Sequence, residues 1–235
     1  MTAILALDTS TPACSVALNI DEVVLEDFRM APRQHNDLIL PMVDQILKQA
    51  GLDLSDLDAI AFGRGPGSFT GLRISAGVVQ GLAYGADLPV IPVSTLAAQA
   101  LEGFQKTGKN YWLSALDARM GEVYIAGYHV NKVDGRYVIE CLFDERVVKP
   151  DMLEVFSEAY QGVGSGWLYE DILSSLLPTK PEYILLDLAP RASCMAELAS
   201  ELLSQGQIVS SYEAMPTYLR DEITWEKQPL RVGKR

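Results

Sequence analysis

The sequence is poor in the two residue types that most often hold metal ions or form disulfides. Its 235 residues include three cysteines, Cys14, Cys141 and Cys194, and two histidines, His35 and His129. The odd number and wide spacing of the cysteines exclude a disulfide scaffold and indicate reduced thiols. No Cys-x-x-Cys or His-x-x-x-His spacing occurs, so we expect no metal site.

A long apolar run is also missing, and so is a basic leader. The most apolar region, Ser75–Val93, contains six Gly, Asp or Pro residues, so it lacks the roughly 18 consecutive apolar residues that a membrane span needs. The opening MTAILALD reaches Asp8 without a basic residue, unlike a secretory signal peptide. We therefore expect a cytoplasmic protein without a membrane anchor.

Positive charge is scarce. The chain has 19 Lys and Arg residues against 31 Asp and Glu residues, a net charge of −12, and the acidic excess is divided evenly between residues 1–100 and 101–235. Such a surface repels phosphate backbones, so the chain alone is not expected to bind nucleic acid. The basic end, with Lys227, Arg231, Lys234 and Arg235, is the local exception and is interpreted as a solvated end.

What is present is a regular alternation of strands and helices. In residues 1–106, short apolar runs between turn residues predict strands, and apolar residues three and four apart predict helices. Asn36 suits an N-cap and Gly51 a helix end. The predicted strands are Ala3–Asp8, Cys14–Ile20, Val23–Met30, Asp58–Gly63 and Pro89–Val93, and the predicted helices are Asn36–Ala50, Phe69–Gly85 and Ser94–Phe104.

Residues 107–210 repeat this order. Leu5–Asp8 and Ser114–Asp117 share Ala-Leu-Asp at an offset of 109 residues. A tandem ββαβαβα plan, in which each copy opens with a strand ending in Asp, predicts an α/β fold of the duplicated actin-like type found in sugar kinases, Hsp70 and actin, with two lobes facing a cleft. A chance match within an ordinary α/β protein is the alternative. Residues 211–235 form a C-terminal segment that could return to the first lobe.

The elements predicted in the second half are more irregular than those of the first. They are the strands Tyr111–Asp117, Glu122–Val130, Tyr137–Phe143 and Tyr183–Leu186, the helices Pro150–Tyr160, Trp167–Leu177 and Pro190–Gln205, and a glycine-rich turn at Gly162–Gly166.

Asp8, Thr9 and Ser10 end the first predicted strand and enter a turn. In kinases and ATPases of this architecture such a hairpin contacts phosphate or its metal, because backbone N–H groups and hydroxyls bind phosphate and a carboxylate holds Mg²⁺. The usual hairpin has glycine where this chain has Ser10, and a side chain there crowds a phosphate. An ordinary turn with local hydrogen bonds is the alternative. If the lobes are duplicates, Asp8 and Asp117 should lie on facing sides of one cleft.

The most distinctive segment is GRGPGSFTGLR, between a predicted strand and a predicted helix. No Gly-Lys-Ser/Thr follows, so it is not a P-loop, but its N–H groups and the helix dipole suit an anion or a partner. A tight turn with an N-cap is the alternative. In the second half, a strand-end Asp and a nearby Arg either contact a ligand or form an ion pair that stabilises their hairpin. The residues expected to make such contacts are Gly65, Gly67, Ser68, Thr70, Arg73, Asp117 and Arg119.

No catalytic residue is predicted. Ser68 lacks the Gly-x-Ser-x-Gly elbow of hydrolases, and neither His35 nor His129 lies in a motif that marks a general base.

The predicted helix Phe69–Gly85 is apolar on nearly all sides, and such a helix must be covered on two sides. Gly77, Gly81 and Gly85 recur every four residues, although a glycine inside a helix costs about 1 kcal/mol relative to alanine. We predict that this flat ridge and part of helix Asn36–Ala50 form a subunit interface; the alternative is that the glycines fit the chain's own sheet. The predicted interface residues are Ile39, Val43, Ile46, Ile74, Gly77, Val78, Gly81 and Gly85.

Motifs spread over nearly the whole chain carry a family resemblance. They are Ala6–Ser10 with Ser15–Ala17, Gly65–Ile74, Ser94–Ala98, Leu116–Arg119 with Glu122–Tyr124, and the closing Pro216, Tyr218–Arg220 and Trp225. With them the chain resembles the TsaB (YeaZ) family of bacterial tRNA threonylcarbamoyladenosine biosynthesis proteins.

The resemblance implies an accessory role. The catalytic relative TsaD transfers a threonylcarbamoyl group to the adenosine next to the anticodon, in tRNAs that read codons beginning with A. A TsaB-type subunit binds and stabilises TsaD, and the ATPase TsaE joins them. TsaD carries a His-x-x-x-His metal motif where this chain has Ser94–Gln99 without a histidine, which implies a pseudo-enzyme without an intrinsic cofactor.

The resemblance also implies how the subunits associate. The chain should form a homodimer in isolation and a heterodimer with TsaD through the same N-terminal lobe, and it should meet tRNA only through the complex. The assembled complex uses ATP, and a nucleotide at the subunit interface is one option. The alternative function is an ATPase or small-molecule kinase of the same fold; a metallopeptidase, the older family label, is third.

Overall fold

The structure is a computed structural model that describes residues 2–220. The first sheet has the order β3-β2-β1-β4-β5, in which β1, β4 and β5 run parallel and β2 pairs antiparallel with both β1 and β3. Three strands precede the first helix, and the predicted elements of this half are confirmed with small changes at their ends. Its elements are β1 (Ala3–Asp8), β2 (Ala13–Ile20), β3 (Val23–Met30), α1 (His35–Ala50), a 3-10 turn at Leu54–Asp56, β4 (Ala59–Gly65), α2 (Phe69–Ala86), β5 (Val90–Ser94) and α3 (Thr95–Thr107).

The second sheet repeats this topology with the order β10-β9-β6-β7-β8. In both sheets the second and third strands lie on one side of the first strand, and the fourth and fifth lie on the other. The predicted duplicated two-lobed α/β fold is therefore confirmed. The elements are β6 (Tyr111–Arg119), β7 (Glu122–Val133), β8 (Arg136–Val148), β9 (Gln161–Val163), α4 (Glu170–Ser175), β10 (Ile184–Leu185) and α5 (Ala192–Ser204), with 3-10 turns at Pro150–Met152, Ser165–Tyr169 and Ser211–Glu213.

The helix predicted at Pro150–Tyr160 is wrong. Only residues 150–152 form a 3-10 turn, and the chain then continues without regular structure. Leu153 and Tyr160 are buried, and the backbone N–H of Phe156 donates to the carbonyl of Leu176. The apolar spacing in this segment therefore reflects burial of an irregular chain, which periodicity alone does not separate from a helix.

The glycine-rich turn predicted at Gly162–Gly166 is wrong for its first two residues, because residues 161–163 form β9. A Cβ on Gly162 would lie 2.5 Å from the Trp167 ring, so this glycine allows a bulky side chain to pack on the strand. The observed helix α4 is shorter than the predicted helix Trp167–Leu177, since residues 165–169 form a 3-10 turn before α4 begins.

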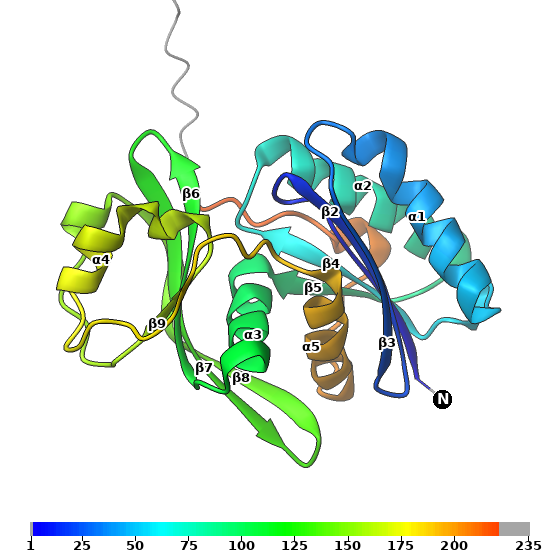
Figure 1. The fold of residues 1–235 in the computed structure, drawn as a ribbon. Coiled ribbons are helices and arrows are strands. Elements are labelled where there is room, and N and C mark those ends of the chain that lie inside the picture. The colour runs from blue at the N-terminus through cyan, green and yellow to red at the C-terminus, as the bar shows by residue number, and fades with distance from the viewer. Residues whose placement is uncertain (1, 221–235) are drawn as a thin grey trace, which may run out of the picture.

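The layers are visible in Figure 1. α1 and α2 cover the outer face of the first sheet, α4 lies beyond the second sheet, and α3 and α5 fill the space between the sheets. Side chains of β1 alternate between two cores: Leu5 and Leu7 pack beneath α1 and α2, whereas Ile4 and Ala6 join the central core. The small Ala6 lets α5 lie close to the first sheet.

The two halves exchange their closing helices. α5 comes from the second half but contacts every strand of the first sheet, whereas α3 comes from the first half and packs mainly on the second sheet. The predicted ranges 1–106 and 107–210 therefore follow the order of the chain, while packing couples each lobe to a helix of the other half.

Residues 211–218 lie against the first lobe. The backbone N–H of Thr217 donates to the carbonyl of Arg64 at 2.8 Å, and the Gln80 amide donates to the carbonyl of Ala214 at 3.1 Å. The remainder of the predicted C-terminal segment, 221–235, with Trp225 and the basic end, lies outside the described residues.

Candidate functional site

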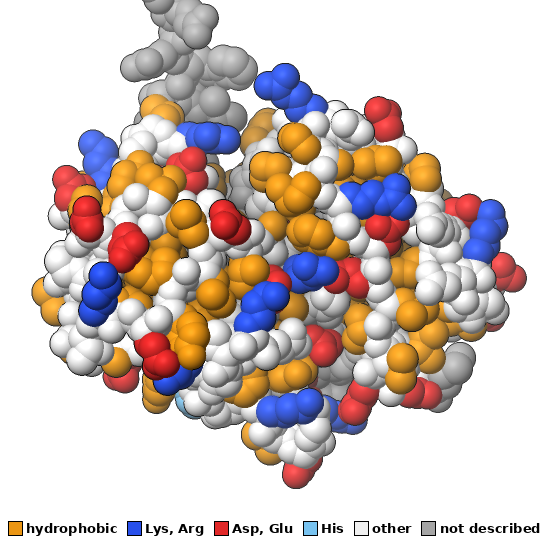
Figure 2. All heavy atoms as spheres, viewed as in Figure 1, with side chains coloured by type: hydrophobic (Ala, Val, Ile, Leu, Met, Phe, Trp, Pro, Cys, Tyr) orange, Lys and Arg blue, Asp and Glu red, His pale blue; other side chains and the backbone are white. Residues whose placement is uncertain are grey.

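A cleft of about 590 Å³ lies between the two lobes. The first lobe lines it with residues 10–12 of the β1–β2 hairpin and with residues 67–69, and the second lobe lines it with residues 116–119 and 186–189. On the face shown in Figure 2, hydrophobic side chains lie on both sides of the boundary between the lobes. Of the predicted contact residues, the cleft brings together Ser10, Gly67, Ser68, Asp117 and Arg119.

The glycine-rich loop packs directly on the β1–β2 hairpin. The Ser68 N–H donates to the Ser10 carbonyl at 2.7 Å, and the Thr9 hydroxyl donates to the Gly71 carbonyl at 2.7 Å. A Cβ on Gly67 would lie 2.6 Å from the Ser10 carbonyl oxygen, and one on Gly71 would lie 1.9 Å from that of Thr9. These glycines are therefore required by contact between two segments of the chain.

Asp8 is buried behind this contact. Its Oδ2 accepts hydrogen bonds from the Ser10 N–H at 3.1 Å and the Ser10 hydroxyl at 2.8 Å, while Oδ1 is buried without a hydrogen-bond partner among residues 2–220. Burial raises the pKa of Asp8 to about 7, although the bonds from Ser10 lower it. The prediction that Asp8 faces Asp117 across the cleft is wrong, because Ser10 lines the cleft in place of Asp8.

Asp117 and Arg119 line the opposite wall and interact with each other. The Asp117 carboxylate accepts from the Arg119 N–H at 2.9 Å and lies 3.4 Å from its guanidinium, whose side chain is 84% exposed. Arg119 has a positive φ of 65° at the hairpin turn, so the carboxylate stabilises the turn while both side chains border the cleft.

The other predicted contact residues lie outside the cleft. Gly65 is buried at the end of β4 with a φ of 112°, a conformation that favours glycine. Thr70 and Arg73 lie on the outward face of α2, where they line a separate groove of about 480 Å³ with Asn36, Phe69, Ile74, Gly77 and Val78. The fold thus separates the glycine-rich motif into a cleft-facing part and an outward-facing part.

The structure divides the predicted interface residues into a buried group and an outward-facing group. Ile39, Val43 and Ile46 of α1 are buried in the first lobe's own core, so the prediction that they meet a partner is wrong. Periodicity identifies an apolar face but not what covers it.

Gly77, Gly81 and Gly85 of α2 face outward. A Cβ on any of the three would have no atom within 4 Å. The alternative that these glycines fit the chain's own sheet is therefore excluded. Ile74 and Val78 lie beside them and are half-buried.

Arg220 is a cleft residue to which the sequence assigned no role. Its guanidinium donates to the Ala118 carbonyl at 3.2 Å and to the Glu122 carboxylate. It lines the cleft, and Tyr218, two residues earlier, hydrogen-bonds to Arg73 of α2 at 3.0 Å. The segment 211–220 therefore connects the outer face of the first lobe to the β6–β7 hairpin of the second.

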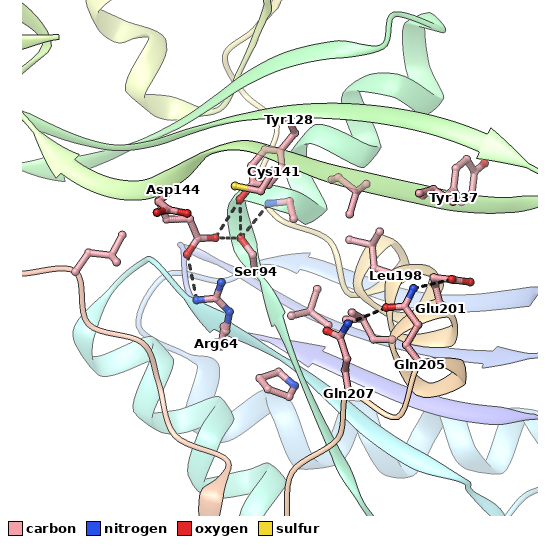
Figure 3. A pocket seen from close by; sticks show the side chains of 18 residues that line it. Arg64, Ser94, Tyr128, Tyr137, Cys141, Asp144, Leu198, Glu201, Gln205 and Gln207 are labelled. Atoms are coloured by element: carbon pink, nitrogen blue, oxygen red, sulfur yellow. Dashed lines mark hydrogen bonds and ion pairs between the residues drawn. The ribbon is translucent and has the colours of Figure 1, made fainter. Parts of the chain in front are cut away.

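A second hollow of about 580 Å³ lies between the lobes, beside β5, β8 and α5 (Figure 3). Glu145 of β8 lies 3.1 Å from the Arg64 guanidinium of β4, accepts from the Tyr128 hydroxyl at 3.0 Å and also accepts from Ser94. Burial and the Glu145 carboxylate raise the pKa of Tyr128 well above its usual value. This cluster joins the two sheets by polar contacts, and no sequence signal marked it.

Two kinds of feature do not occur in residues 2–220. No three His, Cys, Asp or Glu side chains lie close enough together there to hold a metal ion. No helix of that range combines the length and the apolar character needed to cross a bilayer.

Comparison with known proteins identifies relatives of this fold and sequence. Residues 28–154 match the family profile of TsaD, tRNA N6-adenosine threonylcarbamoyltransferase. The tRNA threonylcarbamoyladenosine biosynthesis protein TsaB of Escherichia coli K12 is 43% identical over 96% of this chain and 98% of its own length. The TsaB protein of Haemophilus influenzae is 42% identical over 97% of this chain and 98% of its own length.

A solved structure agrees with these matches. YeaZ from Pseudomonas aeruginosa superposes with a TM-score of 0.85 at 40% identity, covering 93% of this chain and 100% of that one. High identity over almost the full length, a matching fold and a matching family profile lead to one conclusion: the chain belongs to the TsaB (YeaZ) family of tRNA threonylcarbamoyladenosine biosynthesis proteins.

Proposed function

We propose that this chain is a non-catalytic subunit in the biosynthesis of threonylcarbamoyladenosine in tRNA, which binds and stabilises a TsaD-type catalytic subunit that TsaE joins. The observation that carries the proposal is the outward face of α2, where Gly77, Gly81 and Gly85 leave open space above the backbone. The names of the relatives, TsaB of two bacteria, support the pathway.

The chemistry of this face suits a packed helix. Glycines four residues apart let two helix backbones approach closely. Large apolar side chains of α2, α1 and residues 211–220 are left in solvent: Tyr84 is 81% exposed, Leu40 49% and Met215 60%. A surface of this kind is typical of protein contact sites. In this proposal it pairs with a second copy in isolation and with TsaD in the working complex.

The hairpin supports an accessory role over an enzymatic one. A phosphate would have to enter between the glycine-rich loop and the hairpin, but Gly67 and Gly71 already lie against Ser10 and Thr9. The carboxylate of Asp8, which would face a metal in an active relative, is buried and hydrogen-bonded to Ser10. We therefore assign the use of ATP to the assembled complex, with a nucleotide at the subunit interface as a further element of the proposal.

The alternative, an ATPase or small-molecule kinase, is favoured by the cleft of about 590 Å³ between the lobes. The two candidates differ in a direct assay. Purified chain with ATP and Mg²⁺ should show no hydrolysis above background, and turnover by the chain alone would favour the alternative.

The test of the proposed interface is Gly81→Leu. Because space above Gly81 is open and leucine favours helix more than glycine, the variant should fold at least as stably as the parent chain. It should fail to dimerise, fail to bind TsaD, and fail to support tRNA modification in a reconstituted reaction. Gly81→Ala is the matched control, since a single methyl group should weaken assembly far less. Intact assembly of Gly81→Leu, or its unfolding, would contradict the interface.

The net charge predicts how tRNA enters. With a net charge of −12, the chain alone should not bind tRNA with a submicromolar dissociation constant at physiological salt. The partner therefore supplies the positively charged surface that contacts tRNA. Submicromolar binding by the isolated chain in a filter or anisotropy assay would contradict this part of the proposal. A cytoplasmic location, where tRNA is modified, belongs to the same proposal.

A further inference from the structure

Arg73 of α2 is held in place by two aromatic rings. Its guanidinium carbon lies 3.5 Å from the ring centroid of Phe69 and 5.7 Å from that of Tyr218, and its Nε donates to the Tyr218 hydroxyl at 3.0 Å. The two rings contact each other at 5.5 Å between centroids. A stacked, hydrogen-bonded guanidinium loses little further side-chain entropy when it binds, so this cation is pre-organised.

This cation has no acidic partner in the described chain. Arg64, Arg191 and Arg220 each form an ion pair with a glutamate. Within residues 2–220, no carboxylate lies within ion-pair distance of Arg73. Arg33 and Arg146 are also exposed without an ion pair within residues 2–220, so what distinguishes Arg73 is that two rings and a hydroxyl hold its guanidinium in place.

The position of Arg73 relates it to the groove of about 480 Å³ on the outer face of α2. Arg73 precedes Gly77 by four residues, so it lies at one end of the glycine stripe. Because helical side chains lean toward the N-terminus, its guanidinium rests over Phe69 and leaves the stripe uncovered. The N-terminal end of an 18-residue helix adds a partial positive charge at the same end.

We propose that Arg73 is a specificity-determining residue of the partner interface, and that it receives an aspartate or glutamate from the TsaD-type subunit packed on α2. The inference rests on the proposed function, which places the partner on this face. What it adds is the chemistry of the contact: an apolar helix surface over the glycines with one carboxylate at the end where Arg73 lies.

Electrostatics explains why the partner must supply this group. A subunit that covers the groove removes water from Arg73, and a buried guanidinium without a carboxylate is strongly unfavourable. The span 69–86 of α2 contains no Asp or Glu, so a two-fold contact between α2 helices of two copies offers Arg73 no carboxylate within the stripe. In a contact made by α2 alone, the carboxylate therefore favours the heterodimer over the homodimer.

The experiment compares Arg73→Gln and Arg73→Lys with the parent chain. The dissociation constant for purified TsaD and that of the homodimer are measured at low and high salt. Lys180→Gln is the matched control, because it removes one exposed positive charge from the second lobe. Arg73→Gln should weaken TsaD binding about tenfold and reduce its salt dependence, while the homodimer should not be weakened and should become tighter, because glutamine removes an unpaired charge from that contact. Arg73→Lys should retain part of the affinity, and Lys180→Gln should change neither equilibrium.

Three outcomes would overturn the inference. The first is unchanged TsaD binding by Arg73→Gln, and the second is an equal loss of affinity in the homodimer and the heterodimer. The third is an equal loss of TsaD affinity in a variant carrying Asp221→Asn and Glu222→Gln, which would assign the carboxylate to this chain. Gly81→Leu separates this failure from failure of the proposed function. If Gly81→Leu abolishes TsaD binding and Arg73→Gln does not, the interface stands and the role of Arg73 does not.

Discussion

Substitution of alanine for two glycines of the same helix gives opposite expected effects on stability. Gly71 lies in the first turn of α2, and a Cβ there would lie 1.9 Å from the Thr9 carbonyl oxygen and 2.9 Å from its carbon. Gly77 lies two turns later, and a Cβ there would meet nothing within 4 Å. Both changes add the same methyl group, so any difference in sign comes from the surroundings.

The magnitude at Gly71 follows from three terms. The obstacle is backbone, so the hairpin or the helix must move by more than about 1 Å in a close-packed region, which costs about 1–3 kcal/mol. That movement also strains the buried hydrogen bond of 2.7 Å from the Thr9 hydroxyl to the Gly71 carbonyl, worth about 1 kcal/mol. The higher helix propensity of alanine stabilises the folded chain by at most about 1 kcal/mol. Gly71→Ala should therefore destabilise the chain by about 1–3 kcal/mol.

Gly77→Ala keeps only the favourable term and should stabilise the chain by up to about 1 kcal/mol. Urea denaturation of the two variants and the parent chain, followed by circular dichroism, measures both free energies of unfolding. A change of the same sign at both positions would refute the view that Gly71 serves the hairpin contact while Gly77 is free of intramolecular contacts.

Two further predictions concern buried carboxylates. Burial raises the pKa of Asp8 from its ordinary value of 3.8 to about 7, so between these pH values the folded chain holds a proton that the unfolded chain releases. The stability that this proton contributes is complete below about pH 4 and is lost as the pH rises to about 7. Asp8→Asn should remove that part of the pH dependence, up to about 4 kcal/mol, in denaturation measured from pH 4 to 8, and an unaltered slope would contradict the burial argument. Glu145→Gln should lower the free energy of unfolding by about 1–3 kcal/mol, because Arg64, Tyr128 and Ser94 lose a charged acceptor that joins the lobes. Glu140→Gln on the same strand, where the side chain is 71% exposed, is the control and should be near neutral; equal losses would show that the cluster does not join the lobes.

Local sequence signals were sufficient for most elements of the first lobe. The glycine at 51 takes a φ of 69° at the end of α1, and Ser68 caps α2 by accepting from the Gly71 N–H. Strand and helix periods predict these elements correctly because each element packs along its whole length against one sheet. The repeat of Ala-Leu-Asp at the ends of the first strands also indicated the duplication, which the two sheet orders bear out.

The same signals failed where burial occurs without regular structure. Leu153, Phe156 and Tyr160 have helical spacing, yet they pack from an irregular segment held by the Phe156–Leu176 backbone bond. The sequence predicts a turn at Gly162, although the small size of this glycine leaves room for the Trp167 ring. The sequence shows only that glycine lacks a side chain, whereas the neighbouring residues in the structure show whether that absence serves a turn or a close packing contact.

The sequence by itself determined the family, the order of the first-lobe elements, the acidic surface and the motif that joins β4 to α2. Only the tertiary structure decided which apolar residues are core and which face outward. Ile39, Val43 and Ile46 are covered by their own sheet, whereas Gly77, Gly81 and Gly85 are not. It also placed Ser10 in front of Asp8, and it brought Arg64 to Glu145 and Tyr218 to Arg73. The physical reason is that local sequence sets backbone preference and amphipathic period, while burial, pKa and ion pairing depend on segments far apart in the chain.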